Sequence, residues 1–395
     1  SNIGEEGELA QRQFDIPSGS LSEWDGKDWK VIRRNQFTEV TGPGGIEGNA
    51  STSDPIWSLG WDYKSVILAC RDTVAGWTFY RLPKASFAYD GAHGWNTEWP
   101  RIRNVGTREN PDMLMTMHGM FWRFPHTFTS QNTAGITPRG AYLKVIGDFT
   151  EWNGRLVFGC DDSAQSEFLN KRRQKGNIGG TGQSNSNIWF GDISTPDNVG
   201  PTTAAGSLWL KEQVEAGVPS DPFLFAGWDN RCAWMANRSD KDATITFEVD
   251  KKGDGTWTQL RTETLAAGES KFIPFEPQDE GIWIRATSDA TIRADLTFVL
   301  AEAETRTTEP DAIFDGIAVV GGKADSEGLM YGLPDNRRAL GVLATTADGK
   351  AYYELDAAMN LTPHDDPEMS QHIAEKFAIP HDVVPVSYTH LRAHE

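Results

Sequence analysis

The chain of 395 residues carries 37 Lys and Arg residues against 56 Asp and Glu residues, so its formal net charge is −19. An acidic chain without a long basic stretch lacks the electrostatic footprint of a nucleic-acid-binding protein, and no apolar run approaches the roughly 20 residues that a membrane-spanning helix needs. Aromatic residues make up 11% of the chain, far more than in disordered proteins, which predicts a large packed core.

Short apolar runs bounded by Gly, Asp, Asn and Pro make up most of the chain, a pattern typical of β-strands. In chain order, strands are expected at 65–69, 77–82, 113–117, 120–124, 142–146, 155–160, 187–190, 223–226, 231–236, 244–249, 257–262, 271–275, 282–286 and 291–300. Further strands are expected at 313–320, 338–344 and 351–355. Helical periodicity predicts short helices at 207–216 and 366–377.

Many short strands at regular spacing indicate an all-β fold: a sandwich, a barrel or a propeller. The sequence Gly-Trp-Asp occurs at 60–62 and again at 227–229, each time followed by a basic residue and a strand. This weak internal echo favours similar β-units around an axis, so we expect a β-propeller-like fold with about five to seven blades. The alternative is a propeller fragment plus a β-sandwich at 221–300, where the alternation of apolar and polar residues is most regular.

The expected domain order is an N-terminal segment at 1–24, the propeller-like region at 25–300, a polar linker at 301–310 and a further β unit at 311–385. Residues 386–395 look like the in-frame translation of a sequencing adapter, as in a gene assembled from environmental DNA, and are not expected to form part of the fold. We therefore expect the natural chain to continue past Pro385 and the last β unit to be truncated. An ordinary polar tail is the alternative.

The cysteines are Cys70, Cys160 and Cys232, which lie far apart and show no Cys-x-x-Cys spacing. This pattern argues against a zinc or redox site and indicates buried free thiols. A single disulfide between two of them is the alternative.

The densest group of polar and aromatic residues lies at 89–103. Trp and Tyr faces stack on the C–H surfaces of sugar rings, while His, Arg and carboxylates bind hydroxyl or acidic groups. The candidate substrate-binding residues here are Tyr89, His93, Trp95, Trp99, Arg101 and Arg103, with Glu98 as a candidate catalytic acid or base. The alternative is a structural loop with its tryptophans packed inward and its Arg and Glu residues paired.

Two further positions are acid/base candidates. His118 lies in the expected turn between two apolar strands, where a histidine can serve as a general acid or base or can simply bond to the backbone. Carboxylates also accumulate at Asp148, Glu151, Asp161 and Asp162, and we select Asp162 because carboxylates at a strand end can face a gap suited to glycoside hydrolysis. The alternative role of these residues is turn formation.

The sequence Lys-Arg-Arg-Gln-Lys at 171–175 is unusually basic for so acidic a chain, and a Gly/Ser/Asn-rich stretch follows it. Its Arg172 is a candidate for binding the uronate or sulfate groups of an anionic glycan. The alternative is an exposed loop without a ligand. The run is too short to indicate nucleic-acid binding.

The sequence from Asp250 to Gly255 is similar to a calcium-binding loop, but the ligand at its third position and the distal Glu are missing. We interpret it as a β-hairpin turn. No catalytic metal or organic cofactor is expected, and a structural calcium ion is left open.

Four stretches together resemble a group of large bacterial proteins that are common in glycan-degrading lineages. They are Arg81-Leu82-Pro83-Lys84, Trp95-Asn96-Thr97-Glu98-Trp99-Pro100-Arg101, Met117-His118-Gly119-Met120-Phe121 and Pro219-Ser220-Asp221-Pro222-Phe223. The resemblance covers roughly 25–300 and implies an exported, β-rich, propeller-like protein associated with polysaccharide use. It supplies no catalytic residue.

These observations lead to the expectation of a secreted or periplasmic carbohydrate-active enzyme whose partner is a plant or algal polysaccharide or oligosaccharide, with acidic groups. A glycoside hydrolase is slightly favoured, with His118, Glu98 and Asp162 as catalytic residues and Arg101, Arg103 and Arg172 orienting the substrate. One alternative is a polysaccharide lyase that uses His118 with Tyr89. The alternative from a different class is a non-catalytic glycan-binding protein.

Overall fold

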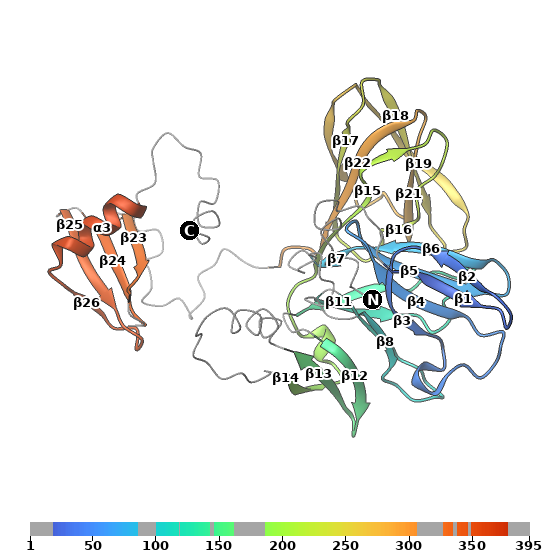
Figure 1. Cartoon of the computed structure of the whole chain (residues 1–395), viewed down its shortest axis with the longest axis horizontal. Helices are drawn as coiled ribbons and strands as arrows, with labels where there is room; N and C mark the ends of the chain where they lie inside the picture. The colour runs from blue at the N-terminus through green and yellow to red at the C-terminus, as the bar shows by residue number, and fades with distance from the viewer. Residues whose placement is uncertain are drawn as a thin grey trace. The chain divides into compact units, whose positions relative to one another are not determined.

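The computed structural model describes residues 19–85, 100–117, 119–142, 146–161, 186–305, 327–334, 338–346 and 349–377. The chain divides into two compact units, Ser1–Thr305 and Arg306–Glu395. The division falls inside the expected linker at 301–310. Strands predominate in both units (Figure 1), so the described part of the chain is nearly all β.

The first unit contains one eight-stranded and one five-stranded sheet. The eight-stranded sheet has the order β19 (Trp257–Leu265), β18 (Ala243–Asp250), β21 (Trp283–Ser288), β16 (Phe223–Leu224), β6 (Gly76–Leu82), β5 (Val66–Asp72), β4 (Ile56–Trp61) and β3 (Gln36–Thr41). The five-stranded sheet has the order β20 (Ser270–Phe275), β17 (Asn230–Asn237), β22 (Ile292–Ala301), β15 (Thr203–Val214) and β7 (Lys84–Ala85).

These two sheets pack face to face as a β-sandwich. Phe223 of the larger sheet stacks on Phe298 of the smaller one with ring centroids 4.9 Å apart, and Phe247 meets Phe275 edge to face at 6.0 Å. Alternate residues of β18 are buried, as expected for strands with one face on a core.

The propeller expectation is not supported: the described strands form no closed propeller. In a propeller, consecutive strands build each blade, whereas the larger sheet here combines β3 to β6 with β16, β18, β19 and β21 from much later in the chain. The two Gly-Trp-Asp sequences also do not share a structural role. At 60–62 it leads from β4 to β5 of one sheet, while at 227–229 it leads from β16 to β17, which belong to different sheets.

The alternative treated 221–300 as a separate sandwich, and this region does supply strands to both sheets of the observed one. It is not separate, however, because β15 pairs with β22 along its length, from Thr203↔Ala301 to Val214↔Ile292. Strand β16 also joins β6 in parallel, at Phe223↔Arg81.

The helix expected at 207–216 is wrong, because these residues lie in and just after strand β15. Its pairing with β22 shifts register twice, between Ser207 and Trp209 and between Trp209 and Glu212. Each bulge inserts residues out of alternation, and Lys211 has a positive φ of 53°. The resulting run of buried residues breaks the strand alternation and resembles helical spacing.

A four-stranded sheet, β11 (Thr137–Ala141), β10 (Met120–Phe124), β9 (Met113–Met117) and β8 (Arg101–Asn104), is buried on both faces. Met113, Met115 and Met117 of β9 pack in the core of the sandwich, whereas Leu114 packs in a second core with Phe121. That second core is completed by the three-stranded sheet of β12 (Ile146–Trp152), β13 (Arg155–Asp161) and β14 (Ser186–Asp192). Of the strand expected at 142–146, Tyr142 lies outside β11 and β12 and Ile146 begins β12, while 143–145 lie outside the described residues.

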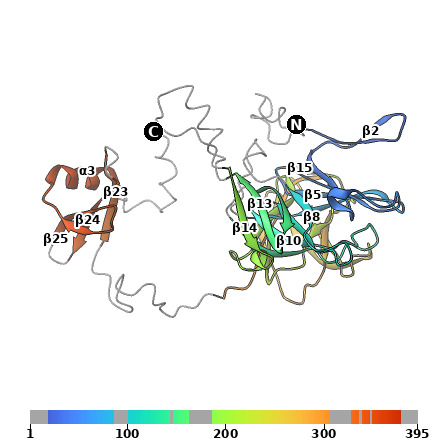
Figure 2. The same cartoon turned by 90° about the horizontal axis from the view of Figure 1, so that it is seen from below.

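The remaining strands of the first unit, β1 (Leu21–Trp24) and β2 (Trp29–Arg33), form a hairpin that projects from it (Figure 2). Glu23 fixes the hairpin to the larger sheet, since its carboxylate pairs with Arg71 at 2.5 Å and accepts the indole N–H of Trp77 at 3.1 Å. Trp24 and Trp29 lie directly opposite each other across the two strands and are 49% and 72% exposed.

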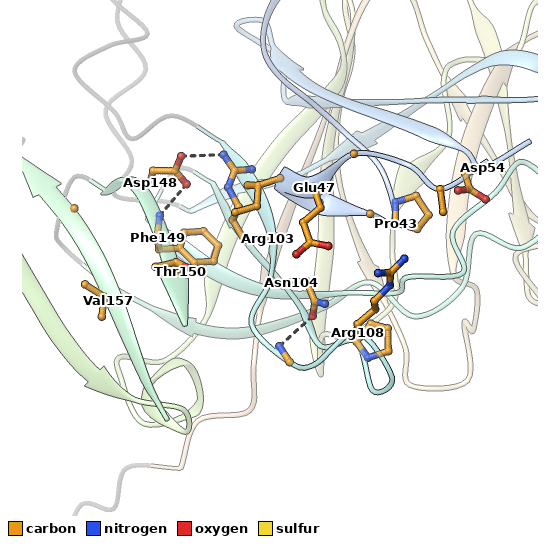
Figure 3. A pocket seen from close by; sticks show the side chains of 18 of the residues that line it. Pro43, Glu47, Asp54, Arg103, Asn104, Arg108, Asp148, Phe149, Thr150 and Val157 are labelled. Carbon is orange, nitrogen blue, oxygen red and sulfur yellow. Dashed lines mark hydrogen bonds and ion pairs between the residues drawn. The ribbon is translucent and has the colours of Figure 1, made fainter. Parts of the chain in front are cut away.

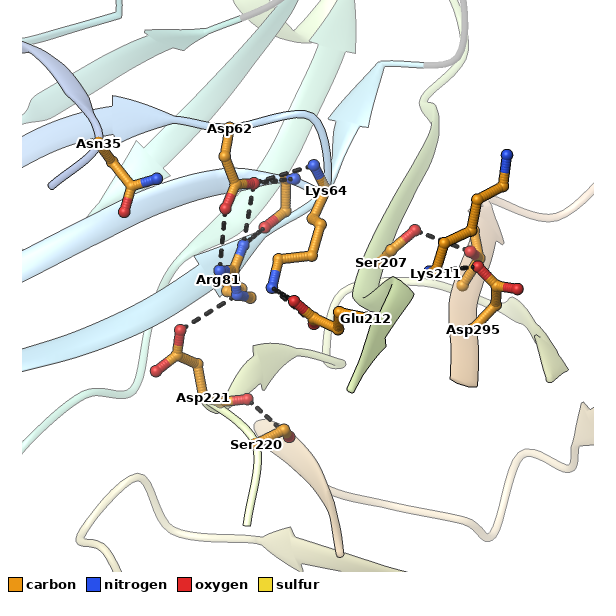
Figure 4. Close-up of polar contacts among 12 residues, drawn as sticks. Asn35, Asp62, Lys64, Arg81, Ser207, Lys211, Glu212, Ser220, Asp221 and Asp295 are labelled. Atoms are coloured by element: carbon orange, nitrogen blue, oxygen red, sulfur yellow. Dashed lines mark hydrogen bonds and ion pairs between the residues drawn. The ribbon is translucent and has the colours of Figure 1, made fainter. Parts of the chain in front are cut away.

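A network of charges joins the N-terminal strands of the larger sheet to the later part of the chain (Figure 4). Arg81 of β6, whose side chain is 3% exposed, donates from Nε to Asp221 Oδ2 at 3.1 Å and from Nη2 to Asp62 Oδ2 at 3.0 Å. Asp221 also pairs with Arg33 at 2.8 Å. Two of the stretches that carry the family resemblance, 81–84 and 219–223, therefore meet in this network.

In the described part of the second unit, β23 (Glu327–Gly332), β24 (Leu340–Thr346), β25 (Gly349–Leu355) and β26 (Leu361–Pro363) form an antiparallel sheet in that order. Helix α3 (Pro367–Phe377) covers one face and places Ile373 against Leu343 and Tyr352. The helix expected at 366–377 is confirmed, with Asp366 capping it through a 2.9 Å bond from Met369 N–H. The strand expected at 313–320 lies outside the described residues.

Candidate functional site

A cavity of about 870 Å³ opens in the first unit where the loop after β3 approaches β8 and the three-stranded sheet (Figure 3). Its polar wall consists of Glu47, Asp54, Arg103, Asn104, Arg108 and Asp148. Ile46 and Ile188 add apolar surface and are 82% and 65% exposed. A cavity of this size can hold a chain of a few sugar units.

The loop that carries Glu47 depends on its glycines. A Cβ on Gly44 would lie 1.8 Å from the carbonyl oxygen of Gly48, so the loop closes on itself only without a side chain at that position. The Asn49 side chain fixes the closed loop by accepting from Gly44 N–H at 3.3 Å and donating to the Pro55 carbonyl at 3.0 Å. Glu47, at the end of the short 3-10 turn Gly45–Glu47, extends its carboxylate into the cavity (Figure 3).

Arg103 and Asp148, which line the cavity, belong to a group of two arginines and two carboxylates that extends behind its wall. Arg101 and Arg103 alternate with Ile102 on β8, so both guanidinium groups lie on the same face of the strand. Arg103 pairs with buried Glu39 of β3 and donates from Nη2 to Asp148 Oδ2 at 2.9 Å. Arg101 lies 3.4 Å from Glu39 and 3.6 Å from Asp148. The four formal charges cancel.

Burial and ion pairing act in opposite directions on the pKa values of this group. Burial raises the pKa of Glu39 from its ordinary value, and the hydrogen bond and charge of Arg103 oppose that shift. Burial works against the charged form of Arg103 as well, but its hydrogen bonds with Asp148 and Glu39 prevail and raise its pKa. The guanidinium of Arg103 is therefore a fixed and fully charged part of the wall.

The loop after β8 presents Arg108 to the same cavity. Asn104 fixes this loop, since its Oδ1 accepts from the N–H groups of Gly106 and Asp112, both at 3.0 Å. The side chain of Arg108 makes no ion pair or hydrogen bond with any residue that the structure describes, and Figure 3 shows its guanidinium on the opposite side of the cavity from Arg103.

Of the residues expected from the sequence, Arg101 and Arg103 are brought together by the structure, although both are neutralised by carboxylates. The others lie outside the described residues: Tyr89, His93, Trp95, Glu98, Trp99, His118, Asp162 and Arg172. Their roles therefore stay predictions. The sequence analysis named Asp148 as one of several carboxylates but did not select it, and it missed Glu39, Glu47 and Arg108. The Gly-rich loop at 42–48 was a local signal for Glu47 alone.

The described residues that flank the predicted catalytic positions lie near this wall. Arg101, which follows the stretch with Glu98, pairs in register with Thr116, close before His118. Tyr142 donates its N–H to the carbonyl of Gly119 at 2.9 Å. Cys160, close before Asp162, pairs with Ile146 of β12, which leads to Asp148.

No group of three or more His, Cys, Asp and Glu side chains among the described residues is arranged to hold a metal ion. The loop with similarity to a calcium site is a hairpin turn: Asp250 Oδ1 accepts from Lys252 and Gly253 N–H, and Oδ2 from Gly255 N–H, at 2.8 to 3.0 Å. All three cysteines are free. Cys70 and Cys160 are buried, as expected, whereas Cys232 is half-buried. Within the described ranges, no helix has the length and apolar character needed to cross a membrane.

Comparison with known proteins gives no family. No protein-family model matches the chain, and no curated protein matches it. Among solved structures, similarity is found to an exo-β-1,3-galactanase from Phanerochaete chrysosporium at 7% identity and a TM-score of 0.19, covering 67% of this chain and 68% of that one. A glycoside hydrolase family 43 arabinoxylan arabinofuranohydrolase from Bacillus subtilis gives 8% identity and a TM-score of 0.19, covering 68% and 76%.

A third match, the PBSX exported protein XepA, gives 12% identity and a TM-score of 0.20, and the alignment covers 34% of this chain and 53% of that protein. All of these TM-scores are far below 0.5, so the similarities define no shared fold. The interpretation of the cavity rests on its own residues.

Proposed function

We propose that the protein is a carbohydrate-active enzyme that binds a plant or algal polysaccharide or oligosaccharide in the cavity beside β8. The observation that supports this is the composition of the wall, where Glu47, Asp54 and Asp148 share one concave space with Arg103 and Arg108. Carboxylates and guanidinium groups bind sugar hydroxyls and acidic substituents, and the exposed side chains of Ile46 and Ile188 supply apolar contact area.

Glycoside hydrolysis is the proposed reaction because it needs two carboxylates in different environments beside one bond. Asp148 is oriented by Arg103 and by its own 2.8 Å bond from Phe149 N–H. The Glu47 side chain has no partner among the described residues and extends into the cavity. Asp148 would act as the oriented carboxylate and Glu47 as the proton donor.

The residues expected from the sequence, Glu98, His118 and Asp162, are retained as a second set of proposed catalytic residues, and Arg172 as a proposed substrate-binding residue. A lyase would use His118 with Tyr89. Export to the periplasm or the medium is part of the same proposal, since polysaccharides are too large to enter a cell intact.

The test is to incubate the purified chain with neutral and acidic polysaccharides and to follow both reducing ends and the absorbance of unsaturated uronates. Reducing ends without new absorbance support the hydrolase, whereas new absorbance shows a lyase. The variants Glu47→Gln and Asp148→Asn should abolish turnover and retain binding. If they retain turnover and Glu98→Gln, His118→Ala or Asp162→Asn loses it, the catalytic site is the one expected from the sequence.

The second candidate is a non-catalytic glycan-binding protein. The observation that favours it is the cross-strand pair of Trp24 and Trp29, with ring centroids 5.5 Å apart and both rings exposed on the projecting hairpin. Exposed indole faces stack on sugar rings. In this case no polysaccharide is cleaved, and Trp29→Ala weakens glycan binding more than Glu47→Gln.

A further inference from the structure

The arginines near the cavity differ in whether their charge is already neutralised. Arg101 and Arg103 share Glu39 and Asp148, and Arg139 forms a two-bond pair with Asp197 at 2.6 and 2.7 Å. An arginine held in this way has little remaining attraction for an incoming anion, because the ligand would have to displace a carboxylate that is already in place.

Arg108 is different, because it lines the cavity and forms no ion pair within the described part of the chain. Its loop is held by the Asn104 side chain and by a bond from Val105 N–H to the Asp112 carbonyl at 2.8 Å. The backbone that carries Arg108 is thus fixed while its guanidinium is available. A planar guanidinium binds a carboxylate or sulfate through two parallel hydrogen bonds.

Two carboxylates that line the same cavity supply the complementary chemistry. Glu47 extends toward the same space, and Asp54 lines it with one oxygen already accepting from Ser51 N–H at 2.9 Å. Carboxylates accept hydrogen bonds from sugar hydroxyls and repel an anionic substituent. A sugar with one acidic group is therefore oriented, with that group toward Arg108 and its hydroxyls toward Glu47.

We infer that the cavity contains a subsite for an anionic sugar unit, and that Arg108, rather than Arg101 or Arg103, binds its carboxylate or sulfate group. This inference rests on the proposed function and specifies its substrate class. Arg101 and Arg103 instead act as positioning residues that hold Asp148 in the wall.

The test measures the affinity of the full chain for trigalacturonate, for a sulfated galactan trisaccharide and for the neutral galactan trisaccharide, using titration calorimetry. At least one of the acidic ligands should bind about tenfold or more tightly than the neutral one, as expected for a hydrogen-bonded charge pair. Comparison of the two acidic ligands shows whether carboxylate or sulfate is recognised.

The variants are Arg108→Ala, Arg108→Lys and the control Arg34→Ala, which removes an exposed arginine outside the cavity. Arg108→Ala should remove the preference for the acidic ligand and leave neutral binding unchanged. Arg108→Lys should keep part of the preference, because lysine retains the charge without the two-bond geometry. Arg34→Ala should behave as the parent chain.

The inference is overturned if Arg108→Ala retains the preference, or if the parent chain binds the neutral ligand as tightly as the acidic ones. In both cases glycan binding itself persists, so the proposed function survives. If the parent chain binds none of the three ligands and cleaves no polysaccharide, the proposed function fails and the inference fails with it. Thermal unfolding of each variant separates loss of binding from loss of fold.

Discussion

Arg81 and Asp221 are 140 positions apart in the sequence, yet Arg81 Nε lies 3.1 Å from Asp221 Oδ2. The contact occurs where β6 meets β16, a junction that has a single register pair. It is reinforced by a 2.7 Å bond from Arg81 N–H to the Pro222 carbonyl. The charge pair therefore holds the N-terminal strands β3 to β6 of the larger sheet against its C-terminal strands, and the loop after β3 lines the cavity.

Asp221→Asn should strongly destabilise the first unit, by about 3–5 kcal/mol, because the buried Arg81 loses one of its two carboxylate partners. Glu212→Gln is the matched control, since Glu212 pairs with Lys64 in the same region but is 38% exposed, and should cost less than about 1 kcal/mol. Urea unfolding followed by Trp fluorescence measures both. Equal effects of the two substitutions would show that Asp221 has no special structural role.

The lowered pKa of Asp62 predicts that the first unit loses stability in acid. Burial would raise its pKa, but the charge and hydrogen bonds of Arg81 prevail and lower it from 3.8 to about 2. Because the folded-state pKa is below the unfolded value, this stabilisation is present above about pH 4 and is lost as the pH falls toward 2. The shift corresponds to about 2 kcal/mol.

The measurement is the free energy of unfolding between pH 5 and 2 in the parent chain and in Asp62→Asn. The variant should be less stable at pH 5, and its stability should fall less steeply with acid. A parallel pH dependence of the two proteins contradicts the assignment.

The backbone conformation of Lys211 predicts that a glycine at this position stabilises the protein. Its φ of 53° lies in the left-handed region, which costs a non-glycine residue about 1 kcal/mol. Its N–H also bonds to Asp295 Oδ1 at 2.7 Å, and a glycine would keep that bond. Lys211→Gly should therefore raise stability by up to about 1 kcal/mol, whereas Glu212→Gly, next along the strand at a position without positive φ, should lower it. Thermal unfolding checks the pair, and destabilisation by both would disprove a strained bulge.

Substitution of Gly44 should weaken glycan binding without unfolding the protein. Gly44→Ala places a methyl group against the Gly48 carbonyl and must open the loop that carries Glu47. Gly147→Ala, on β12 beside Asp148, is the control, because its nearest contact is an ordinary 3.6 Å. Affinity for an oligosaccharide substrate should fall in the first variant alone. Unchanged binding in Gly44→Ala would remove the loop from the site.

The sequence predicted local structure well and assembly poorly. Strands β9 and β10 have the predicted bounds because their flanking turns are short and their apolar runs unbroken. A sandwich was only the alternative, because the packing of its two sheets depends on pairs such as Phe223 and Phe298 that lie far apart in the chain. The bulged β15 was predicted as a helix because its register shifts hide the alternation.

For the candidate site too, local features could be predicted from the sequence and the contacts between distant segments could not. Sequence analysis selected Arg101 and Arg103 from their aromatic surroundings, but their neutralisation depends on Glu39, which comes from a strand that no local pattern connects to β8. Arg108 has unremarkable neighbours in the sequence and Glu47 is marked only by its Gly-rich loop. The folding of two loops toward one cavity brings them together.

The most direct test of the account is hydrogen–deuterium exchange of the full chain with and without a polysaccharide-derived oligosaccharide that it cleaves or binds. The account predicts that protection appears in the loop at 43–54, in the loop at 104–111 and at 148–159, which together line the cavity. Protection confined to the hairpin at 21–33, with these segments unchanged, would contradict it and place glycan binding on Trp24 and Trp29.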